Sequence, residues 1–168
     1  MGAPRARRPS YRGAPLTVSV VPTKLAREQI KALRGKARAS FVLAVEDIRR
    51  RGCAAGVRLS GEALSGICRL DLYGAWRLVT AFEAPDRCVL LLVAEHTRSA
   101  SPYRLLSEAL GLDEPEEPRT KPSCCDADGQ PPIDPDLAER FERGLPELGL
   151  TRARTRPQRH RRSNPRVP

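Results

Sequence analysis

The amino-acid sequence predicts an α+β domain in which one strand and a pair of helices precede a three-stranded antiparallel meander. Apolar residues recur at helical spacing in the first third of the chain, and three short apolar runs follow in quick succession. The links between these runs are too short for a crossover helix, so the runs are expected to pair as antiparallel neighbours. At 168 residues the chain has room for one ordinary domain with added segments.

A strand and a helical hairpin are expected first. Residues 16–21, LTVSVV, alternate between two faces and are rich in β-branched side chains, which is typical of a strand. Helical spacing follows, and Gly35 divides it into two helices. The second helix is expected to end at 49–52, because basic residues suit a last turn and glycine is a usual stop. Its apolar stripe comprises Ala37, Phe41, Ala44, Val45 and Ile48.

The meander follows a Gly- and Ser-containing loop. Its strands are expected at residues 67–73, 75–82 and 87–94. The third strand is apolar on both faces, so it is expected at the covered centre of the sheet. The first two strands alternate, which places Arg69 and Asp71 on one face. In the second strand, Arg77 points away from the core face that Trp76 occupies. In an antiparallel hairpin, Arg69 and Arg77 are then expected to share one face of the sheet, beside Asp71.

The C-terminal third changes in character. Ser101-Pro102 is a good helix start, and the helix is expected to end at Gly111. This completes the order β-α-α-β-β-β-α for the folded domain. Residues 112–133 are rich in proline and acids, which is typical of an exposed linker, and Asp134-Pro135 opens a further helix.

Charge divides the chain into segments. The net charge is +10, but residues 112–149 carry −7 and the last 19 residues carry +7. Basic ends of this kind either meet a polyanion such as nucleic acid or only keep a protein soluble. We expect a disordered basic arm (1–14), a folded domain (15–111), an acidic Pro-rich linker (112–134), a helix (135–149) and a disordered Arg-rich tail (150–168).

The cysteines favour free thiols. There are five, an odd number, and three lie in apolar settings where cysteine behaves as a small hydrophobe. A disulfide framework is therefore not expected, and a reducing cytoplasmic location fits better. Cys124-Cys125 lacks a second ligand pair at zinc spacing, so no metal and no cofactor are expected. The sequence shows no signal peptide and no run of the ~18 apolar residues that a membrane span needs.

One stretch of the chain resembles a known family. The strings CRLDLYGAWRLVTAF and DRCVLLLVAEHTRSASPY are similar to the RelE/ParE superfamily of bacterial type II toxin-antitoxin toxins. Family members pair an N-terminal helical hairpin with a twisted antiparallel sheet. They carry a basic hairpin, then an apolar strand, then a polar stretch that ends in tyrosine. The matching residues are Arg69, Gly74, Trp76, Arg77 and Tyr103, and the resemblance covers about 15–106.

The resemblance implies a function and partners. RelE-like members are metal-independent endoribonucleases (mRNA interferases) that cut mRNA on the ribosome, and ParE-like members inhibit DNA gyrase. Both kinds are neutralised by an antitoxin protein. For this chain it implies a cytoplasmic toxin with an antitoxin, the ribosome and mRNA as partners, and with gyrase as the alternative target. A RelE-fold protein without nuclease activity, acting as a protein or nucleic-acid binding module, is the other alternative.

The resemblance also implies site residues. Arg77 matches the phosphate-holding arginine and Arg69 a basic residue of the preceding strand. His96 and Arg98 fall near a second basic group, and Tyr103 matches the terminal tyrosine, which stacks on a base or transfers a proton. Each also has a plainer interpretation: Arg77 as a solvent-facing residue, Arg69 in a surface ion pair, His96 as a strand cap and Tyr103 as a packing residue.

Two positions depart from the family pattern. Asp71 and Thr97 stand where RelE-like ribonucleases often carry basic residues, and an acid on the phosphate face repels substrate unless Arg69 pairs with it. The acidic segment 112–149 adds a further hypothesis, that it folds back on the basic face and competes with RNA. In the alternative hypothesis its helix packs on the domain and extends the core.

Overall fold

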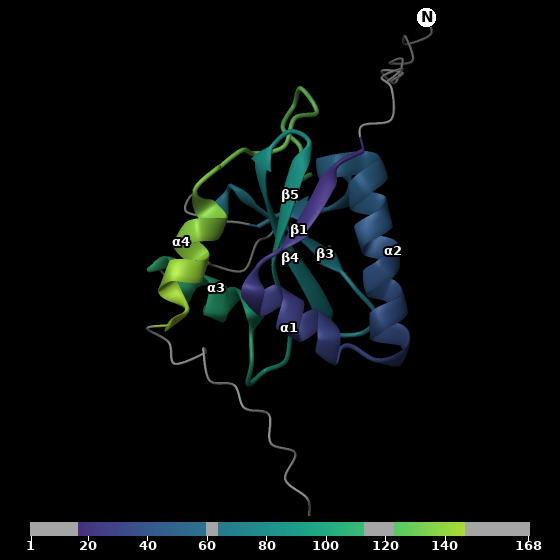
Figure 1. Ribbon diagram of the computed structural model, residues 1–168, viewed down its shortest axis with the longest axis vertical. Helices are drawn as coiled ribbons and strands as arrows, with labels where there is room; N and C mark the ends of the chain where they lie inside the picture. The colour runs from purple at the N-terminus through teal and green to yellow at the C-terminus, as the bar shows by residue number, and fades with distance from the viewer. Residues whose placement is uncertain (1–16, 60–63, 113–122, 147–168) are drawn as a thin grey trace, which may run out of the picture.

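The computed structural model describes residues 17–59, 64–112 and 123–146 (Figure 1). A five-stranded sheet in the order β1-β5-β4-β3-β2 separates two layers of helices. Helices α1 and α2 cover one face, and α3 and α4 lie on the other (Figure 1). The strands are β1 (Ser19–Pro22), β2 (Val57–Arg58), β3 (Ile67–Asp71), β4 (Trp76–Ala84) and β5 (Arg87–Glu95). The helices are α1 (Lys24–Ala32), α2 (Gly35–Arg51), the 3-10 turn η1 (Gly52–Ala55), α3 (Pro102–Leu110) and α4 (Leu137–Gly144).

The mixed α+β class predicted from the sequence is confirmed, but the sheet differs from the prediction in the direction of β1 and in the added strand β2. Strands β3, β4 and β5 form the expected antiparallel meander. Strand β1 instead pairs parallel to β5, with Ser19 opposite Arg87 and Pro22 opposite Leu90. Because the helical hairpin connects β1 to the rest of the sheet, β1 can run in the same direction as β5, which a tight turn would not permit.

The helical hairpin is fixed by its caps. The Thr23 side-chain oxygen accepts a hydrogen bond from the Ala26 N–H (3.1 Å) and donates one to the Leu91 carbonyl (2.7 Å). The start of α1 is therefore tied to β5, which lies inside the sheet between β1 and β4. Helix α2 ends at Gly52, whose φ of 57° is a conformation that favours glycine. The predicted split at Gly35 and the predicted stop after 49–52 are both confirmed.

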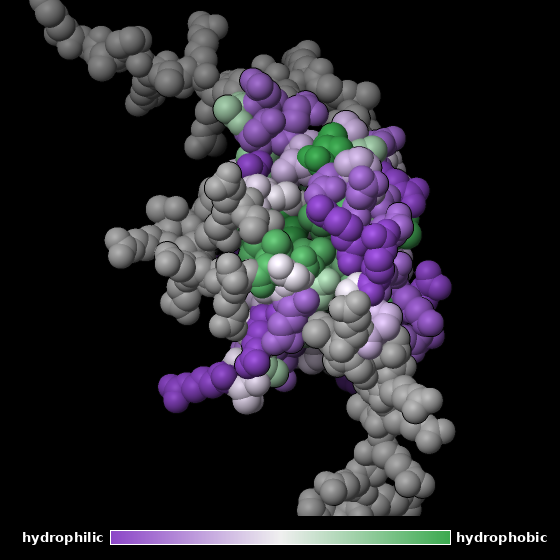
Figure 2. Space-filling model, turned by 90° about the vertical axis from the view of Figure 1, so that its left-hand side faces the viewer, coloured by the Kyte–Doolittle hydropathy of each residue, from purple (hydrophilic) through white to green (hydrophobic). Residues whose placement is uncertain are grey.

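The core lies in two layers, one on each face of the sheet. Phe41 and Ile48 of α2 pack with Leu78 and Phe82 on one face. On the other face, Leu106 of α3 and Phe141 of α4 pack against the sheet. Burying one such side chain stabilises the fold by roughly 2 kcal/mol. The face that carries α4 is shown in Figure 2, where apolar side chains gather near the middle and hydrophilic ones lie above, below and to the right of them.

Strand β2 was not predicted. It lies inside the expected loop over 53–66, and two residues are too few to show an alternating pattern. Gly56 allows the chain to approach β3 here, because a Cβ at this position would lie 2.9 Å from the Arg69 carbonyl oxygen. Such a distance is shorter than real Cβ contacts, so only glycine fits without a backbone shift.

The expected exposed linker over 112–133 is only partly exposed among the described residues. Cys124 is fully buried, Ser123 forms an antiparallel bridge with Val57, and Ile133 forms a parallel bridge with Phe82. Helix α4 then packs on α3, β4 and β5, as in the alternative hypothesis of a core-extending helix. The expected arm, the tail and residues 113–122 lie outside the described residues, and the domain boundaries stay a prediction.

The expectation of free cysteines is wrong for four of the five, so free thiols no longer support a reducing location. Cys53 is joined to Cys125 and Cys68 to Cys124, with Cα–Cα distances of 5.1 and 5.6 Å. The packing of η1 beside β3 brings Cys53 and Cys68 near each other. The adjacent residues Cys124 and Cys125 can then each form a disulfide with one of them. Sequence spacing carries no sign of this proximity. Cys88 is free and buried, and desolvation raises the pKa of its thiol to about 12.

Candidate functional site

The predicted site residues of the first two meander strands lie on the face that α3 covers. In the β3–β4 ladder, Asp71 stands directly opposite Arg77 and Arg69 opposite Val79. Directly opposed residues point to the same face of a sheet. Val79 belongs to the core layer under α3 and α4, so Arg69, Asp71 and Arg77 all project toward that layer. Strand alternation predicts this shared face, and the ladder register produces it.

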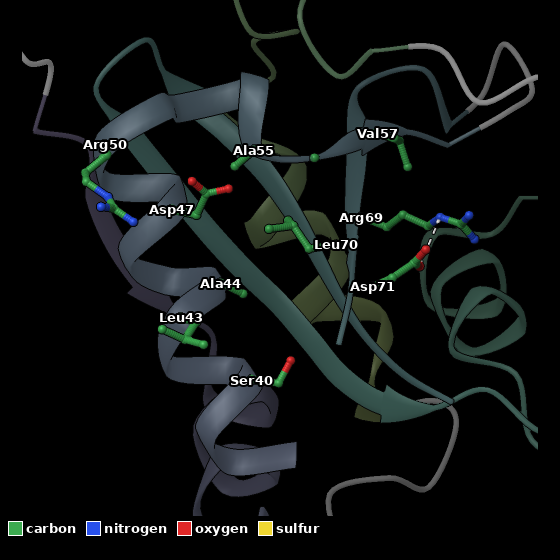
Figure 3. A pocket seen from close by; sticks show the side chains of 11 residues that line it. Ser40, Leu43, Ala44, Asp47, Arg50, Ala55, Val57, Arg69, Leu70 and Asp71 are labelled. Carbon is green, nitrogen blue, oxygen red and sulfur yellow. Dashed lines mark ion pairs between the residues drawn. The ribbon is translucent and has the colours of Figure 1, made fainter. Parts of the chain in front are cut away.

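Asp71 lies between the two arginines. Its Oδ1 is 3.1 Å from Nε of Arg77 and 3.8 Å from Nε of Arg69. The arginine side chains are 19% and 15% exposed, whereas the aspartate is 48% exposed. Two largely buried cations therefore share a single acid, which is more exposed than they are. These three residues, here called the cluster, keep a net positive charge. Figure 3 shows the paired ends of Arg69 and Asp71 pointing away from α2.

Arg77 is anchored by its own turn. Its Nη1 donates to the carbonyls of Trp76 (2.9 Å) and Gly74 (3.2 Å). Gly74 has a φ of +65°, which turns the chain between β3 and β4. The Nε atom of Arg77 is buried, and its approach to Asp71 is an ion pair without hydrogen-bond geometry. The Arg77 side chain is therefore fixed in position by these contacts and is not freely solvated.

Tyr103 joins the cluster from α3. Nη1 of Arg69 donates to the Tyr103 hydroxyl at 2.7 Å, and the Arg69 guanidinium carbon lies 5.8 Å from the centre of the tyrosine ring. The His96 ring lies beyond, with 5.3 Å between the two ring centroids and a tilt of 52°. Ser101 places this tyrosine by capping α3, because its side chain accepts from the Tyr103 N–H. The contacts thus run continuously from Asp71 through Arg69 and Tyr103 to His96.

The structure brings together four of the five predicted site residues. Arg69, Arg77, His96 and Tyr103 are linked, but Arg98 is exposed in the loop after β5 and does not join the cluster. Thr97 organises that loop, since its hydroxyl accepts from the Ala100 N–H at 3.0 Å. The carbonyls that hold Arg77 were missed, because backbone acceptors leave no residue-type signal in a sequence.

An open groove of about 530 Å³ lies next to the cluster, between α2 and the β2–β3 edge. Ser40, Leu43, Asp47 and Arg50 form its α2 wall, and Leu70 lies at its floor (Figure 3). Arg69 and Asp71 contribute to the rim, but their charged ends point to the other face of the sheet. The groove and the charged cluster are therefore separate features of the surface.

The residues of this cluster do not form a metal site. Within residues 17–59, 64–112 and 123–146, no group of three or more His, Cys, Asp or Glu side chains is arranged to hold a metal ion. In the same part of the chain, no helix has the length and apolar character to cross a membrane. What the cluster offers chemically is two guanidinium donors, one carboxylate, one phenol and one imidazole.

The chain was compared with family models, curated proteins and solved structures. No family model matches the chain, and no curated protein matches it. Among solved structures, it is similar to a chain of the RelBE2 toxin-antitoxin complex from Mycobacterium tuberculosis. The two are 24% identical with a TM-score of 0.41, and the match covers 48% of this chain and 99% of that one.

Proposed function

We propose that this chain is the toxin component of a type II toxin-antitoxin system and that it cuts mRNA on the ribosome. The observation that carries the proposal is the shared approach of Arg69 and Arg77 to one oxygen of Asp71. Two guanidiniums that converge on one carboxylate oxygen also suit the oxygens of a phosphodiester. The sequence resemblance to RelE/ParE toxins supports the same assignment.

The proposed reaction needs no metal. The 2′-hydroxyl of the RNA attacks the adjacent phosphorus, the bond to the 5′-oxygen breaks, and a cyclic phosphate forms. One group must accept the proton of the 2′-hydroxyl, and another must donate a proton to the leaving oxygen. His96 and Tyr103 are the candidates for these transfers, and their rings lie next to each other. Arg69 and Arg77 would stabilise the charge that develops on the phosphoryl oxygens.

Asp71 is expected to compete with the substrate. A phosphate that binds both arginines has to displace this carboxylate or share the guanidiniums with it. Because the aspartate is 48% exposed, solvent can rehydrate it when it is displaced. The cost of displacement is therefore modest, but it lowers affinity relative to a cluster that has a neutral residue at this position.

The test is controlled expression in bacteria. Induction of the wild-type chain is expected to arrest growth and to produce new mRNA 5′ ends that are phased with codons. Arg77→Ala is expected to abolish both effects. Arg143→Ala removes the same charge from the exposed surface of α4, outside the cluster, and should leave both unchanged. Growth arrest that persists in Arg77→Ala would remove the basis for this proposal.

A second candidate function is favoured by the same ion pairs. Asp71 neutralises part of the positive charge, and Arg77 donates hydrogen bonds to two backbone carbonyls. A surface of this kind also suits a RelE-fold protein without nuclease activity, such as a ParE-like gyrase inhibitor or a binding module. Uncut mRNA together with blocked DNA supercoiling during growth arrest would favour the gyrase inhibitor.

The proposal includes the partners and the location. An antitoxin protein would neutralise the chain, and the ribosome and mRNA would be its targets in the cytoplasm. Co-expression with the product of a neighbouring small gene is expected to restore growth. Failure of every adjacent gene product to restore growth would argue against a toxin-antitoxin pair.

A further inference from the structure

Residues 123–125, here called the strap, are held to the folded domain by two disulfides from adjacent cysteines. We propose that these disulfides make the strap a redox-sensitive latch on the β2 edge of the sheet, which stabilises the position of Arg69. The functional consequence rests on the proposed RNA-binding function, whereas the latch itself does not. Cys125 is joined to Cys53 of η1, and Cys124 is joined to Cys68 of β3.

The strap occupies the edge of the sheet in the manner of an added strand. Ser123 pairs with Val57 in an antiparallel bridge, and the Cys124 N–H donates to the Gly56 carbonyl at 3.2 Å. From the other direction, Nη2 of Arg58 donates to the Cys124 carbonyl at 2.9 Å. Strand β2 is only two residues long, so these few hydrogen bonds alone would hold the strap weakly. The disulfides and the burial of Cys124 in the core supply the rest of the attachment.

The latch is connected to the candidate site through β3. Cys68 immediately precedes Arg69, so its disulfide fixes the backbone from which that arginine projects. Gly56, whose carbonyl accepts from the strap, lies against the Arg69 carbonyl so closely that a side chain would not fit. Release of the strap would loosen Gly56 and the start of β3 together, and Arg69 would lose part of its positioning.

The two disulfides differ in access. Cys125 is partly exposed, whereas Cys68 and Cys124 are 1% and 0% exposed. A reducing thiolate has to contact one sulfur of the bond that it breaks, so burial protects a disulfide. We therefore expect Cys53–Cys125 to be reduced first and Cys68–Cys124 only after the strap has started to move.

The chemistry needs a thiol reductant, such as a dithiol. Its thiolate attacks one sulfur, the protein disulfide breaks, and a mixed disulfide forms. The second thiolate of the dithiol then attacks the mixed disulfide and releases the second protein sulfur as a thiolate. For each bond, two electrons pass to the protein, two protein thiols take up two protons, and the dithiol becomes a cyclic disulfide.

The order of reduction can be measured on the full chain. The oxidised protein is titrated with dithiothreitol, trapped with iodoacetamide and mapped by peptide mass spectrometry. Labelling of Cys53 and Cys125 is expected at lower reductant than labelling of Cys68 and Cys124, and Cys88 should stay unlabelled until the protein is denatured. Simultaneous labelling of both pairs, or labelling of the buried pair first, would overturn the ordered latch.

The effect on the edge is measured separately by amide hydrogen exchange. Reduction is expected to raise exchange at Gly56, Val57 and Cys124 while the α1–α2 hairpin stays protected. The double variant Cys53→Ser/Cys125→Ser should show part of this increase without reductant, and Cys88→Ala should show none. Unchanged exchange at these three amides after full reduction would refute the latch, whatever the protein does to RNA.

The functional arm uses a fluorescein-labelled oligoribonucleotide. Its affinity is expected to fall roughly fivefold on reduction, at the low end of the coupling that links two sites in a protein. Equal RNA affinity in both redox states would show that the latch does not affect the candidate site. Absence of binding in either state would contradict the proposed function, while the exchange measurement would still decide on the latch.

Discussion

The carboxylate of Asp71 lies 3.1 Å from Nε of Arg77, its directly opposed neighbour on the adjacent strand. In the sequence, Asp71 counts against an RNA-binding role for Arg77, because an acid repels RNA. In the structure, this acid is the ion-pair partner of that arginine. The positively charged site therefore contains its own negatively charged partner.

Replacing this acid should strengthen RNA binding. Asp71→Asn keeps the size of the side chain and removes the competing charge. Because Asp71 is 48% exposed, screening limits the gain to about 0.5–1 kcal/mol, which is roughly a two- to fivefold increase in affinity. Asp86→Asn, in the exposed β4–β5 turn, is the matched control. The measurement is anisotropy of a labelled oligoribonucleotide, and an unchanged or weaker affinity would show that Asp71 does not compete.

The Tyr103 hydroxyl should contribute to both stability and activity. Tyr103→Phe removes the acceptor of the 2.7 Å hydrogen bond from Arg69 but keeps the ring beside His96. We expect a loss of about 1 kcal/mol in the free energy of unfolding, measured in urea. If the hydroxyl transfers a proton, cleavage should fall by about a hundredfold or more. A stability loss with full cleavage would leave Tyr103 with a packing role only.

Gly144 should be essential for the close packing of α4 on α3. A Cβ at this position would overlap the carbonyl oxygen of Ala109 in α3, so the two helices meet backbone to backbone. Gly144→Ala is expected to cost about 2–3 kcal/mol in unfolding free energy, because overpacking forces the helices apart. Gly66→Ala is the matched control, since its Cβ would meet Leu137 at an ordinary 3.6 Å. Equal urea midpoints for the two variants would contradict this close backbone contact between α3 and α4.

The buried Cys88 thiol should make stability fall at high pH. Burial raises its pKa from 9.0 to about 12, so between these values the unfolded chain loses this proton and the folded chain keeps it. This contribution is complete below pH 9 and is lost as pH rises toward 12. The difference in unfolding free energy between wild type and Cys88→Ala is expected to shrink over that window. A difference that stays constant from pH 8 to pH 11 would show that the thiol ionises normally.

The two disulfides should dominate the stability of the strap region. They span sequence separations of 72 and 56 residues. In the chain-entropy model, a loop of such length corresponds to about 4 kcal/mol for the first disulfide formed. Reduction is therefore expected to lower the urea midpoint strongly, and the comparison is made with and without dithiothreitol. A midpoint that is insensitive to reductant would mean that the strap is held by other contacts.

Local patterns in the sequence were enough to predict the helical hairpin, the meander and how the residues of its strands alternate between the two faces of the sheet. Alternation placed Arg69, Asp71 and Arg77 together because side chains on a strand follow a fixed period of two. The contact of Tyr103 with Arg69 depends on how the 96–101 loop returns α3 to the sheet, and no local pattern encodes that path. The disulfides and the two-residue strand β2 depend on tertiary proximity in the same way.

The most direct test of the proposed function uses ribosomes that are programmed with a defined mRNA and incubated with the purified chain. The account predicts cleavage within the codon at the decoding site, without added metal beyond that which the ribosome needs. Cleavage should be lost in Arg77→Ala and retained in Arg143→Ala. An mRNA that stays intact with folded wild-type protein, or cleavage that survives in Arg77→Ala, would contradict the assignment of this cluster as an RNA-cutting site.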